Sequence, residues 1–224
     1  IERHALLGFV RFADYDGMVI TGSSLHAYDT DFAVTNQIAM TAEFAQTGKP
    51  ILGSCWGLQI AVMAAGGLVE YNPKGREVGF ARKIVATEAG RDHPMLRGRG
   101  AAFDAPCIHY DEVTRLPENA TLLASNAHSK IQAAVVPLGR SEVWAVQYHP
   151  EFDLMTLANL YRLYADDMVA QRFFADRAAL DQHVALIAGL AANPDDMGLA
   201  WQLGVDGDIT TPANRRAEII NWVE

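Results

Sequence analysis

A short apolar strand that runs straight into an apolar helix limits what this chain can fold into. The run Ile51–Ser54 has the length and composition of a buried strand. It passes without a linker into Cys55–Gln59, and an apolar helix then continues to Ala65, where Gly66-Gly67 ends it. A strand followed at once by a helix is half of a βαβ unit, so this segment favours a parallel sheet covered by helices.

The segment before it shows the same order. The apolar run Asp16–Ile20 closes on a loop rich in Gly and Ser, Thr21–Ser24, as a buried strand does before a tight turn. Apolar or small residues recur at helical spacing between Val34 and Gln46, and Gly48 and Pro50 end that helix. We therefore expect an α/β fold with a doubly wound, mostly parallel sheet flanked by helices.

Between Leu68 and Tyr148, short strand candidates replace the helices. Turn-rich pieces such as Asn72–Gly75 and Leu138–Ser141 separate them. The candidate strands are Leu68–Tyr71, Phe80–Ala86, Ala102–His109, Ala120–Ala124, Ile131–Val136 and Val143–Tyr148. We interpret them as strands added to the same sheet, together with a smaller antiparallel layer.

The pattern becomes helical after residue 153. Asp153 is a suitable N-cap, and apolar residues mark one helical face from Leu154 to Met168. A second helix surrounds Val184, and Pro212 opens a third. We expect residues 1–153 to form the α/β domain and residues 154–224 to form a helical extension packed on it.

Charge and composition exclude several classes of protein. The formal net charge of −9 argues against a nucleic-acid surface, and no apolar stretch is long enough to span a membrane. The first residues show no secretory signal, so a cytoplasmic enzyme is the simplest interpretation. Two cysteines are too few for a disulfide scaffold. We expect no metal and no cofactor, because six histidines lack metal-ligand spacing: His4, His26, His93, His109, His128 and His183.

Cys55 lies in a G-x-C-x-G pattern between the predicted strand and the predicted helix. This is the cysteine form of the nucleophile elbow, a turn so tight that small neighbours are needed on both sides. The thiol then lies at a helix N-terminus, which favours the thiolate, and the N–H of Trp56 is free to donate to an oxyanion. The alternative is a buried structural cysteine, which is also how we interpret Cys107.

A second motif, Gln147–Glu151, follows the apolar strand that ends at Val146. A thiol nucleophile needs a base, and the base needs a group that orients it. His149 at the strand end and Glu151 two residues later supply both groups. The same spacing alone also fits a surface loop, so the interpretation depends on its combination with the cysteine elbow.

Together the two motifs resemble the class I, or triad, glutamine amidotransferases, and in particular stand-alone proteins similar to the glutaminase domain of GMP synthase. The resemblance covers roughly residues 14–153. Three further segments resemble the family's oxyanion loop region, the segment after its cysteine helix and its H-G-D segment: Asp14–Asp29, Asn72–Gly79 and His109–Asp111. The resemblance implies a class I glutamine amidotransferase-like, flavodoxin-like fold and hydrolysis through a γ-glutamyl thioester.

The resemblance also implies a role for each matching position. Cys55 would attack the side-chain amide of glutamine, His149 would protonate the leaving ammonia and later activate water, and Glu151 would orient His149. The other positions are the oxyanion-hole N–H groups of Ser23 and Trp56 and the substrate-binding residues Gln59, Gly22 and His109.

The sequence departs from the family pattern at three places. The oxyanion loop reads Gly22-Ser23-Ser24 where the family often has Gly-Gly-Pro, and the side chain of Ser23 restricts φ. Tyr110 replaces the glycine of the H-G-D segment. Few residues precede the strand at Asp16, so the strand-helix-strand that normally begins the family sheet is incomplete in this sequence.

Three functions fit these residues. The first is hydrolysis of the glutamine side-chain amide, which gives glutamate and ammonia for transfer to an unknown acceptor. The second is hydrolysis of another γ-glutamyl amide or peptide by the same triad, because only the leaving group differs. The third is a non-catalytic binding or regulatory module that keeps the fold.

The expected partners are glutamine or another γ-glutamyl small molecule, and neither nucleic acid nor membrane. The C-terminal helices complete the core, or else they form a homodimer face or a docking site for an ammonia-consuming synthetase; Trp201 and Trp222 suit either role. Lys74 and Arg76 could hold a carboxylate, but basic residues in a turn are typically exposed.

Overall fold

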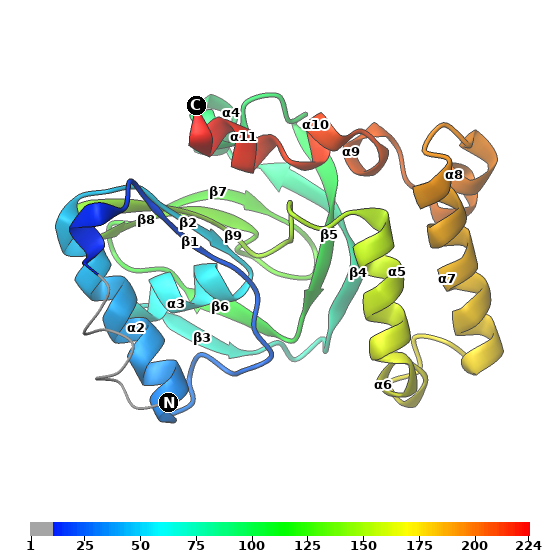
Figure 1. The fold of residues 1–224 in the computed structure, drawn as a ribbon, viewed down its shortest axis with the longest axis horizontal. Coiled ribbons are helices and arrows are strands. Elements are labelled where there is room, and N and C mark those ends of the chain that lie inside the picture. The colour runs from blue at the N-terminus through cyan, green and yellow to red at the C-terminus, as the bar shows by residue number, and fades with distance from the viewer. Residues whose placement is uncertain (1–10) are drawn as a thin grey trace.

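The computed structural model describes residues 11–224 and contains a curved seven-stranded sheet and a separate two-stranded sheet (Figure 1). The strand order is β1-β2-β9-β8-β7-β4-β5 in the large sheet and β3-β6 in the small one. The strands are β1 Met18–Ile20, β2 Ile51–Ser54, β3 Leu68–Tyr71, β4 Glu77–Ala86, β5 Ala102–His109, β6 Asp111–Arg115, β7 Thr121–Ser125, β8 Ala133–Leu138 and β9 Ser141–Val146.

Helices flank the large sheet. The α-helices are α2 Phe32–Phe44, α3 Trp56–Ala64, α4 Glu88–Asp92, α5 Leu154–Leu163, α6 Ala165–Ala170, α7 Arg177–Ala192, α8 Met197–Leu203, α9 Gly207–Thr210, α10 Pro212–Arg215 and α11 Ala217–Val223. Short 3₁₀ turns are η1 Phe12–Asp14, η2 Ala45–Thr47 and η3 Pro94–Leu96.

The α/β fold predicted from the sequence is confirmed, but the described sheet has a larger antiparallel part than the sequence pattern predicted. Strands β1, β2 and β9 pair in parallel. From β9 outward to β5 each described pairing is antiparallel. The connections explain this difference, because β8 and β9 are joined by a tight turn at Gly139, with φ 58°, whereas parallel neighbours need a long crossover such as the one through α2.

The predicted smaller antiparallel layer is the β3-β6 sheet. Strand β3 has the predicted range, but the sequence pattern did not reveal β6. Charged residues at Asp111, Glu112 and Arg115 obscure the apolar signal of that strand. In the structure Val113 of β6 is buried and supplies the apolar contact that the strand needs.

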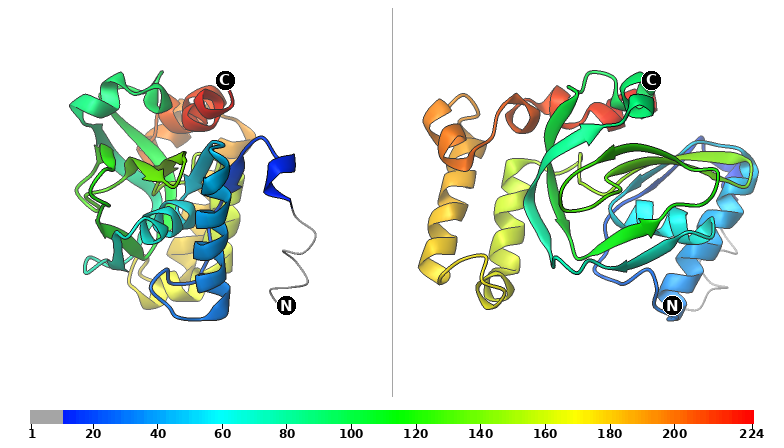
Figure 2. Two further views of the ribbon diagram at one scale, coloured as in Figure 1. Left: turned by 90° about the vertical axis from the view of Figure 1, so that its left-hand side faces the viewer. Right: turned by 180° about the vertical axis from the view of Figure 1, so that it is seen from behind.

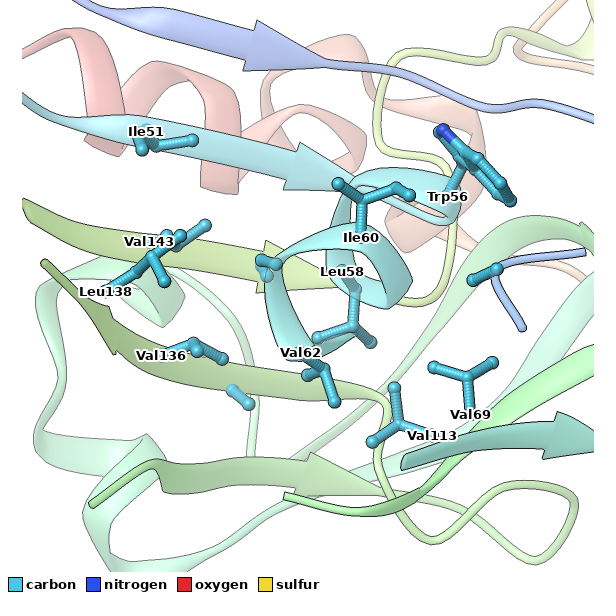
Figure 3. Packing of buried hydrophobic residues seen from close by; sticks show 14 of the residues in the cluster. Ile51, Trp56, Leu58, Ile60, Val62, Val69, Val113, Val136, Leu138 and Val143 are labelled. Atoms are coloured by element: carbon cyan, nitrogen blue, oxygen red, sulfur yellow. The ribbon is translucent and has the colours of Figure 1, made fainter. Parts of the chain in front are cut away.

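Helix α3 packs between the two sheets (Figure 3). Its apolar side chains are buried and form one cluster with Ile51 of β2, Val136 of β8 and Val69 of β3. A fully buried aliphatic side chain contributes about 1.5–3 kcal/mol, so this cluster fixes the helix firmly. The burial holds the N-terminus of α3, and therefore Cys55, in one place.

Helices α5 and α7 lie beside the β4–β5 end of the large sheet (Figures 1 and 2). Helix α5 begins at Leu154 because the Asp153 carboxylate accepts a hydrogen bond from the Thr156 N–H at 2.7 Å. Phe80 of β4 belongs to the same apolar cluster as Leu157 of α5 and Leu180 of α7. The C-terminal helices therefore share a core with the sheet.

The last helix returns to the sheet near β5. Glu218 of α11 accepts hydrogen bonds from Arg99 Nε at 2.9 Å and from the Tyr148 hydroxyl at 2.7 Å. Trp222 packs against Gly17, where an added Cβ would lie 2.9 Å from the indole ring, whereas Trp201 is 75 % exposed. Helix α11 thus supports Tyr148, the residue that precedes His149. A docking role for Trp201 stays a prediction.

Expectations about the start of the sequence, including His4 and most of the incomplete N-terminal unit, fall on residues 1–10, which lie outside the described part. Within residues 11–224, none of the helices combines the length and the apolar composition that a membrane-spanning segment requires.

Candidate active site

Cys55 occupies a strained turn between β2 and α3. It is the N-cap of α3, and its φ of 52° and ψ of −97° fall outside the regions that non-glycine residues favour. Such a conformation costs on the order of 1–3 kcal/mol and persists only where the surroundings enforce it. Here the Cys55 N–H donates to the Val146 carbonyl at 2.8 Å, which ties the turn to β9. The predicted nucleophile elbow is thus present as a backbone geometry.

The two glycines of the G-x-C-x-G pattern are required by close backbone contacts. A Cβ added at Gly53 would lie 2.6 Å from the carbonyl carbon of Gly57. A Cβ added at Gly57 would lie 2.3 Å from the Ile20 carbonyl oxygen of β1. Because both distances are to main-chain atoms, no side-chain adjustment can make room, and the elbow closes only with glycine at these positions.

His149 is held from several sides in the loop after β9. Its Nδ1 lies 2.7 Å from Glu151 Oε1, and its ring stacks on Phe152 at a centroid distance of 3.9 Å and an angle of 4°. Its backbone N–H donates to the Pro106 carbonyl at 2.7 Å. The Glu151 contact occupies Nδ1, so Nε2 is the nitrogen left for proton transfer.

The charges of Cys55, His149 and Glu151 are coupled. Burial alone would lower the pKa of His149, but the negative charge of the Cys55 sulfur and its hydrogen bond, followed by Glu151, raise that pKa to about 10. Burial would raise the pKa of Glu151, but the hydrogen bond and the positive charge of His149 hold it below its usual value. The arrangement therefore favours a protonated His149 beside the Cys55 sulfur and the Glu151 carboxylate.

Ser54 is part of this arrangement, although no sequence pattern singled it out. Its hydroxyl lies 2.9 Å from both carboxylate oxygens of Glu151 and 3.4 Å from His149 Nδ1. Ser54 ends β2 and directly precedes the elbow, so the strand that positions Cys55 also positions Glu151.

All of the predicted site residues except Trp56 line one cavity of about 570 Å³, a size typical of small-molecule sites. Cys55, His149 and Glu151 line it together with the loop from Thr21 to His26. Four predicted substrate or oxyanion residues also line the cavity: Gly22, Ser23, Gln59 and His109. Other parts of the wall come from β5, the β5–β6 turn, helix α5 and its C-cap residue: Ile108, His109, Tyr110, Leu160 and Tyr164.

Gly22 is fitted closely to the catalytic histidine candidate. A Cβ added there would lie 2.9 Å from Cε1 of His149, so a larger residue would push the ring or the loop away. The neighbouring Ser23 hydroxyl accepts a hydrogen bond from the Leu25 N–H at 3.2 Å, which stabilises the bend of the loop. The substitution of Ser for Gly in the family pattern therefore adds a contact that fixes this loop.

Trp56 follows Cys55 directly but does not line the cavity, and its proposed role concerns only its backbone N–H. Its indole is buried, and Nε1 donates to Gln37 Oε1 of α2 at 2.8 Å. As the first residue of α3, Trp56 has a backbone N–H without a partner inside the helix. That N–H is the donor that the sequence pattern predicted for an oxyanion hole.

Gln59 and His109 are already engaged with protein groups. The Gln59 amide nitrogen donates to the Asp111 carbonyl at 3.2 Å and to Gln147 Oε1 at 3.4 Å. His109 has Nδ1 2.9 Å from the Asp111 carbonyl and Nε2 2.9 Å from Glu77 Oε2. With both ring nitrogens bonded to the protein, His109 forms part of the cavity wall and offers no free nitrogen to a substrate.

Arg76 has a different environment from the one the sequence predicted. Exposed side chains were expected for Lys74 and Arg76. Lys74 is exposed, but the expectation is wrong for Arg76, which is 7 % exposed and lines the cavity. The guanidinium carbon lies 4.0 Å from the ring centre of Tyr110 and 5.1 Å from that of Tyr164. Tyr164 comes from the C-terminal helices, so no local sequence signal could have revealed the burial.

Metal ligation has no support in the described part of the chain. Residues 11–224 contain no group of three or more His, Cys, Asp or Glu side chains placed to hold a metal ion.

Cys107 lies on β5, fully buried, and burial raises the pKa of its thiol well above the ordinary value. Cys55, in contrast, opens onto the cavity.

The chain is similar to several groups of known proteins. The family model of the class-I glutamine amidotransferases matches residues 6–161. A γ-glutamyl-L-1-hydroxyisopropylamide hydrolase from Pseudomonas sp is 35 % identical over 215 residues, which are 94 % of this chain and 72 % of the relative. A glutamine-hydrolysing GMP synthase subunit from Methanoregula boonei is 34 % identical over 110 residues, 49 % of this chain and 56 % of the relative.

The fold itself has close counterparts among solved structures. A glutamine amidotransferase from Thermotoga maritima superposes with a TM-score of 0.69 at 18 % identity, covering 96 % of this chain and 81 % of that structure. The fold expected from the resemblance is thereby confirmed. Since the family model covers well over half of the sequence and a relative matches along nearly all of it, the chain belongs to the class I glutamine amidotransferases, enzymes of the cysteine hydrolase type.

Proposed function

We propose that this protein hydrolyses γ-glutamyl amides through a thioester on Cys55. The observation that carries the proposal is the convergence of three groups at one cavity: the sulfur at a strained helix N-terminus, the His149 imidazole, and the Glu151 carboxylate 2.7 Å from Nδ1 of that imidazole. A thiol, a base and an orienting carboxylate in this relation are what acyl transfer requires.

The first half of the proposed reaction releases an amine. The Cys55 thiolate attacks the γ-carbonyl carbon, and the N–H groups of Trp56 and Ser23 donate to the oxyanion that forms. The His149 imidazolium then gives the proton on Nε2 to the leaving nitrogen, the C–N bond breaks, and the amine departs. The products of this half are the γ-glutamyl thioester, a neutral imidazole and the free amine.

The second half releases glutamate. A water molecule loses a proton to His149 as it attacks the thioester carbonyl, and the C–S bond breaks to return the thiolate. Glu151 keeps the imidazole in the orientation that both halves need, and Ser54 holds Glu151 through hydrogen bonds of 2.9 Å. The positive charge that His149 gains is stabilised by Glu151 on one side and by the returning thiolate on the other.

We infer further that the leaving group is an organic amine. The similarity to the γ-glutamyl-L-1-hydroxyisopropylamide hydrolase extends over 94 % of the chain and therefore includes the C-terminal helices, which supply Leu160 and Tyr164 to the cavity wall. The similarity to the GMP synthase subunit covers 49 %. Helices that enclose the cavity suit a larger leaving group better than ammonia.

Glutamine hydrolysis that supplies ammonia to an acceptor enzyme is the second candidate. The 110-residue similarity to a GMP synthase subunit favours it, because that relative is part of a glutamine-hydrolysing synthetase. In this case a synthetase would be the partner, and the exposed Trp201 face of the C-terminal helices would be available for docking.

A panel of γ-glutamyl substrates separates these candidates. The wild-type protein and Cys55→Ala are assayed with glutamine, γ-glutamyl methylamide and γ-glutamyl 2-hydroxyethylamide, and released glutamate is measured. We expect turnover of the two amine conjugates above that of glutamine, and none with Cys55→Ala. Preference for glutamine would support the second candidate, and turnover that survives in Cys55→Ala would refute the thioester route.

A further inference from the structure

The cavity that contains Cys55 also contains a buried cation that the proposed reaction does not use. Arg76 follows the turn at Gly75 and immediately precedes β4. It is 7 % exposed, and its side chain lines the same cavity as Cys55 and His149.

The contacts of the Arg76 guanidinium are not those of an ion pair. Its charge faces the rings of Tyr110 and Tyr164, with the guanidinium carbon 4.0 Å and 5.1 Å from their centres. Nη1 lies 4.0 Å from the Met168 sulfur, and Nε is buried without a hydrogen-bond partner. Among residues 11–224 no carboxylate oxygen lies within 4.0 Å of a guanidinium nitrogen of Arg76.

The polar groups near Arg76 have other partners. The adjacent Glu77 carboxylate accepts from Asn126 at 2.7 Å, from Gln132 at 2.8 Å and from His109 at 2.9 Å. The Tyr110 hydroxyl accepts from Gln171 Nε2 at 2.6 Å. These groups therefore hydrogen-bond to other residues and not to Arg76, and the guanidinium keeps free N–H donors beside the cavity.

A buried guanidinium without an anion is unfavourable. Arginine stays protonated in proteins, so burial cannot be relieved by loss of the proton. The two aromatic rings offset part of the cost of removing the charge from water, but cation–π contacts are weaker than a charge-assisted hydrogen bond. The planar fork of the guanidinium matches a carboxylate through two parallel hydrogen bonds.

We propose that Arg76 binds a carboxylate of the substrate and thereby selects γ-glutamyl compounds. This inference rests on the proposed function, because it assigns a binding residue to the same cavity. The carboxylate has two sources with the same chemistry: the α-carboxylate of the γ-glutamyl group, which every such substrate carries, or a carboxylate on the leaving amine, which only γ-glutamyl amino acids carry. The rings of Tyr110 and Tyr164 help to position the guanidinium, whose carbon lies 4.0 Å and 5.1 Å from their centres.

The test compares Arg76→Gln, Arg76→Lys and the matched control Lys74→Gln, which alters an exposed basic residue of the same turn that does not line the cavity. The substrates are γ-glutamyl methylamide, with one carboxylate, and γ-glutamylglycine, with a second on the leaving amine. The rate at which neutral iodoacetamide alkylates Cys55 serves as the reference without a carboxylate.

An α-carboxylate contact predicts that Arg76→Gln loses about 10- to 100-fold in kcat/KM on both substrates, mainly through KM. A leaving-group contact predicts the same loss on γ-glutamylglycine alone. In both cases Cys55 of Arg76→Gln is alkylated at the wild-type rate, and Lys74→Gln keeps the wild-type kcat/KM. Arg76→Lys recovers part of the loss, because lysine keeps the positive charge but lacks the planar, forked guanidinium.

Two results with Arg76→Gln would overturn the inference alone. One is an unchanged kcat/KM on both substrates. The other is a loss that alkylation by iodoacetamide shares, since a shared loss marks a structural role. Should Arg76→Gln fail to fold, Arg76→Lys carries the same comparison. Failure of the proposed function looks different, because the wild type would then hydrolyse neither substrate, which would overturn both claims.

Discussion

The Ser54 hydroxyl lies 2.9 Å from each carboxylate oxygen of Glu151, although nearly a hundred residues separate the two in the chain. Ser54 ends the strand that leads into Cys55, so one strand end supports both the nucleophile candidate and the carboxylate that contacts His149. This contact connects the two motifs of the site and gives the first prediction.

Replacement of Ser54 by Ala should lower kcat about 10-fold and leave KM nearly unchanged, because loss of a hydrogen bond to a charged group weakens the orientation of His149 but not substrate binding. Steady-state kinetics with γ-glutamyl methylamide measure both constants. Ser141→Ala is the matched control, since its buried hydroxyl bonds only to the carbonyls of Ala45 and Lys49. Equal kcat values for Ser54→Ala and the wild type would contradict the positioning role.

The elbow glycines give a prediction about stability. Gly57→Ala should prevent folding or destabilise the protein by about 3 kcal/mol or more, because the new Cβ would lie 2.3 Å from the Ile20 carbonyl oxygen. Gly207→Ala is the control, since its added Cβ meets its nearest atom at an ordinary 3.5 Å. Urea unfolding of both variants tests this. A Gly57→Ala protein as stable as Gly207→Ala would show that β1 does not approach the elbow as described.

The protonation state of His149 gives a prediction about pH. The pKa of about 10 arises mainly from the Cys55 sulfur acting against burial, so Cys55→Ala should lower it substantially. NMR of histidine labelled with ¹⁵N should find His149 protonated at about pH 8 in the wild type and neutral in Cys55→Ala. Identical titration curves in the two proteins would show that the Cys55 sulfur does not raise the pKa of His149.

The sign of the linked stability effect follows from this raised pKa. A folded-state pKa above the ordinary 6.5 contributes stability that is fully present below about pH 6.5 and is lost as the pH rises towards 10. The free energy of unfolding attributable to His149 should therefore fall across this window in the wild type. In Cys55→Ala the fall should be smaller, which thermal unfolding at several pH values can measure.

The C-terminal helix gives a fourth prediction. The side chains of Arg99 and Glu218 are 1 % and 0 % exposed and form an ion pair of 2.9 Å. Glu218→Gln should destabilise the protein by about 3–5 kcal/mol, because it removes the negative charge that balances the buried Arg99 guanidinium. Glu224→Gln, which alters the exposed pair with Arg97, should change the free energy of unfolding by less than about 0.5 kcal/mol. Equal stabilities of the two variants would argue against this anchoring of α11.

Local patterns predicted the parts of this protein that local interactions create. The elbow at Cys55 follows from a strand, two glycines and a helix that are adjacent in sequence, and the contact between His149 and Glu151 needs only two residues of separation. Asp153 caps α5 through its own neighbouring backbone. In each case the sequence signal lies within a few residues, although contacts with Val146 and Ile20 complete the elbow.

Contacts between distant segments explain what the sequence patterns did not reveal. Arg76 is buried because Tyr110 and Tyr164 meet around it, and Tyr164 belongs to a helical region far along the chain. His109 was expected to contact substrate, but its ring nitrogens are taken by Asp111 and by Glu77 of β4. The large antiparallel share of the sheet likewise depends on which strands pair, which spacing along the chain does not specify.

Covalent capture of Cys55 tests the account most directly. The protein is treated with a diazo-ketone analogue of glutamine, digested, and the labelled peptide is identified by mass spectrometry. We predict one label per chain, on Cys55 and not on buried Cys107, with loss of labelling in Cys55→Ala and slower labelling when His149 is replaced by Asn. Absence of label on Cys55, or equal labelling of Cys107, would contradict the thioester mechanism.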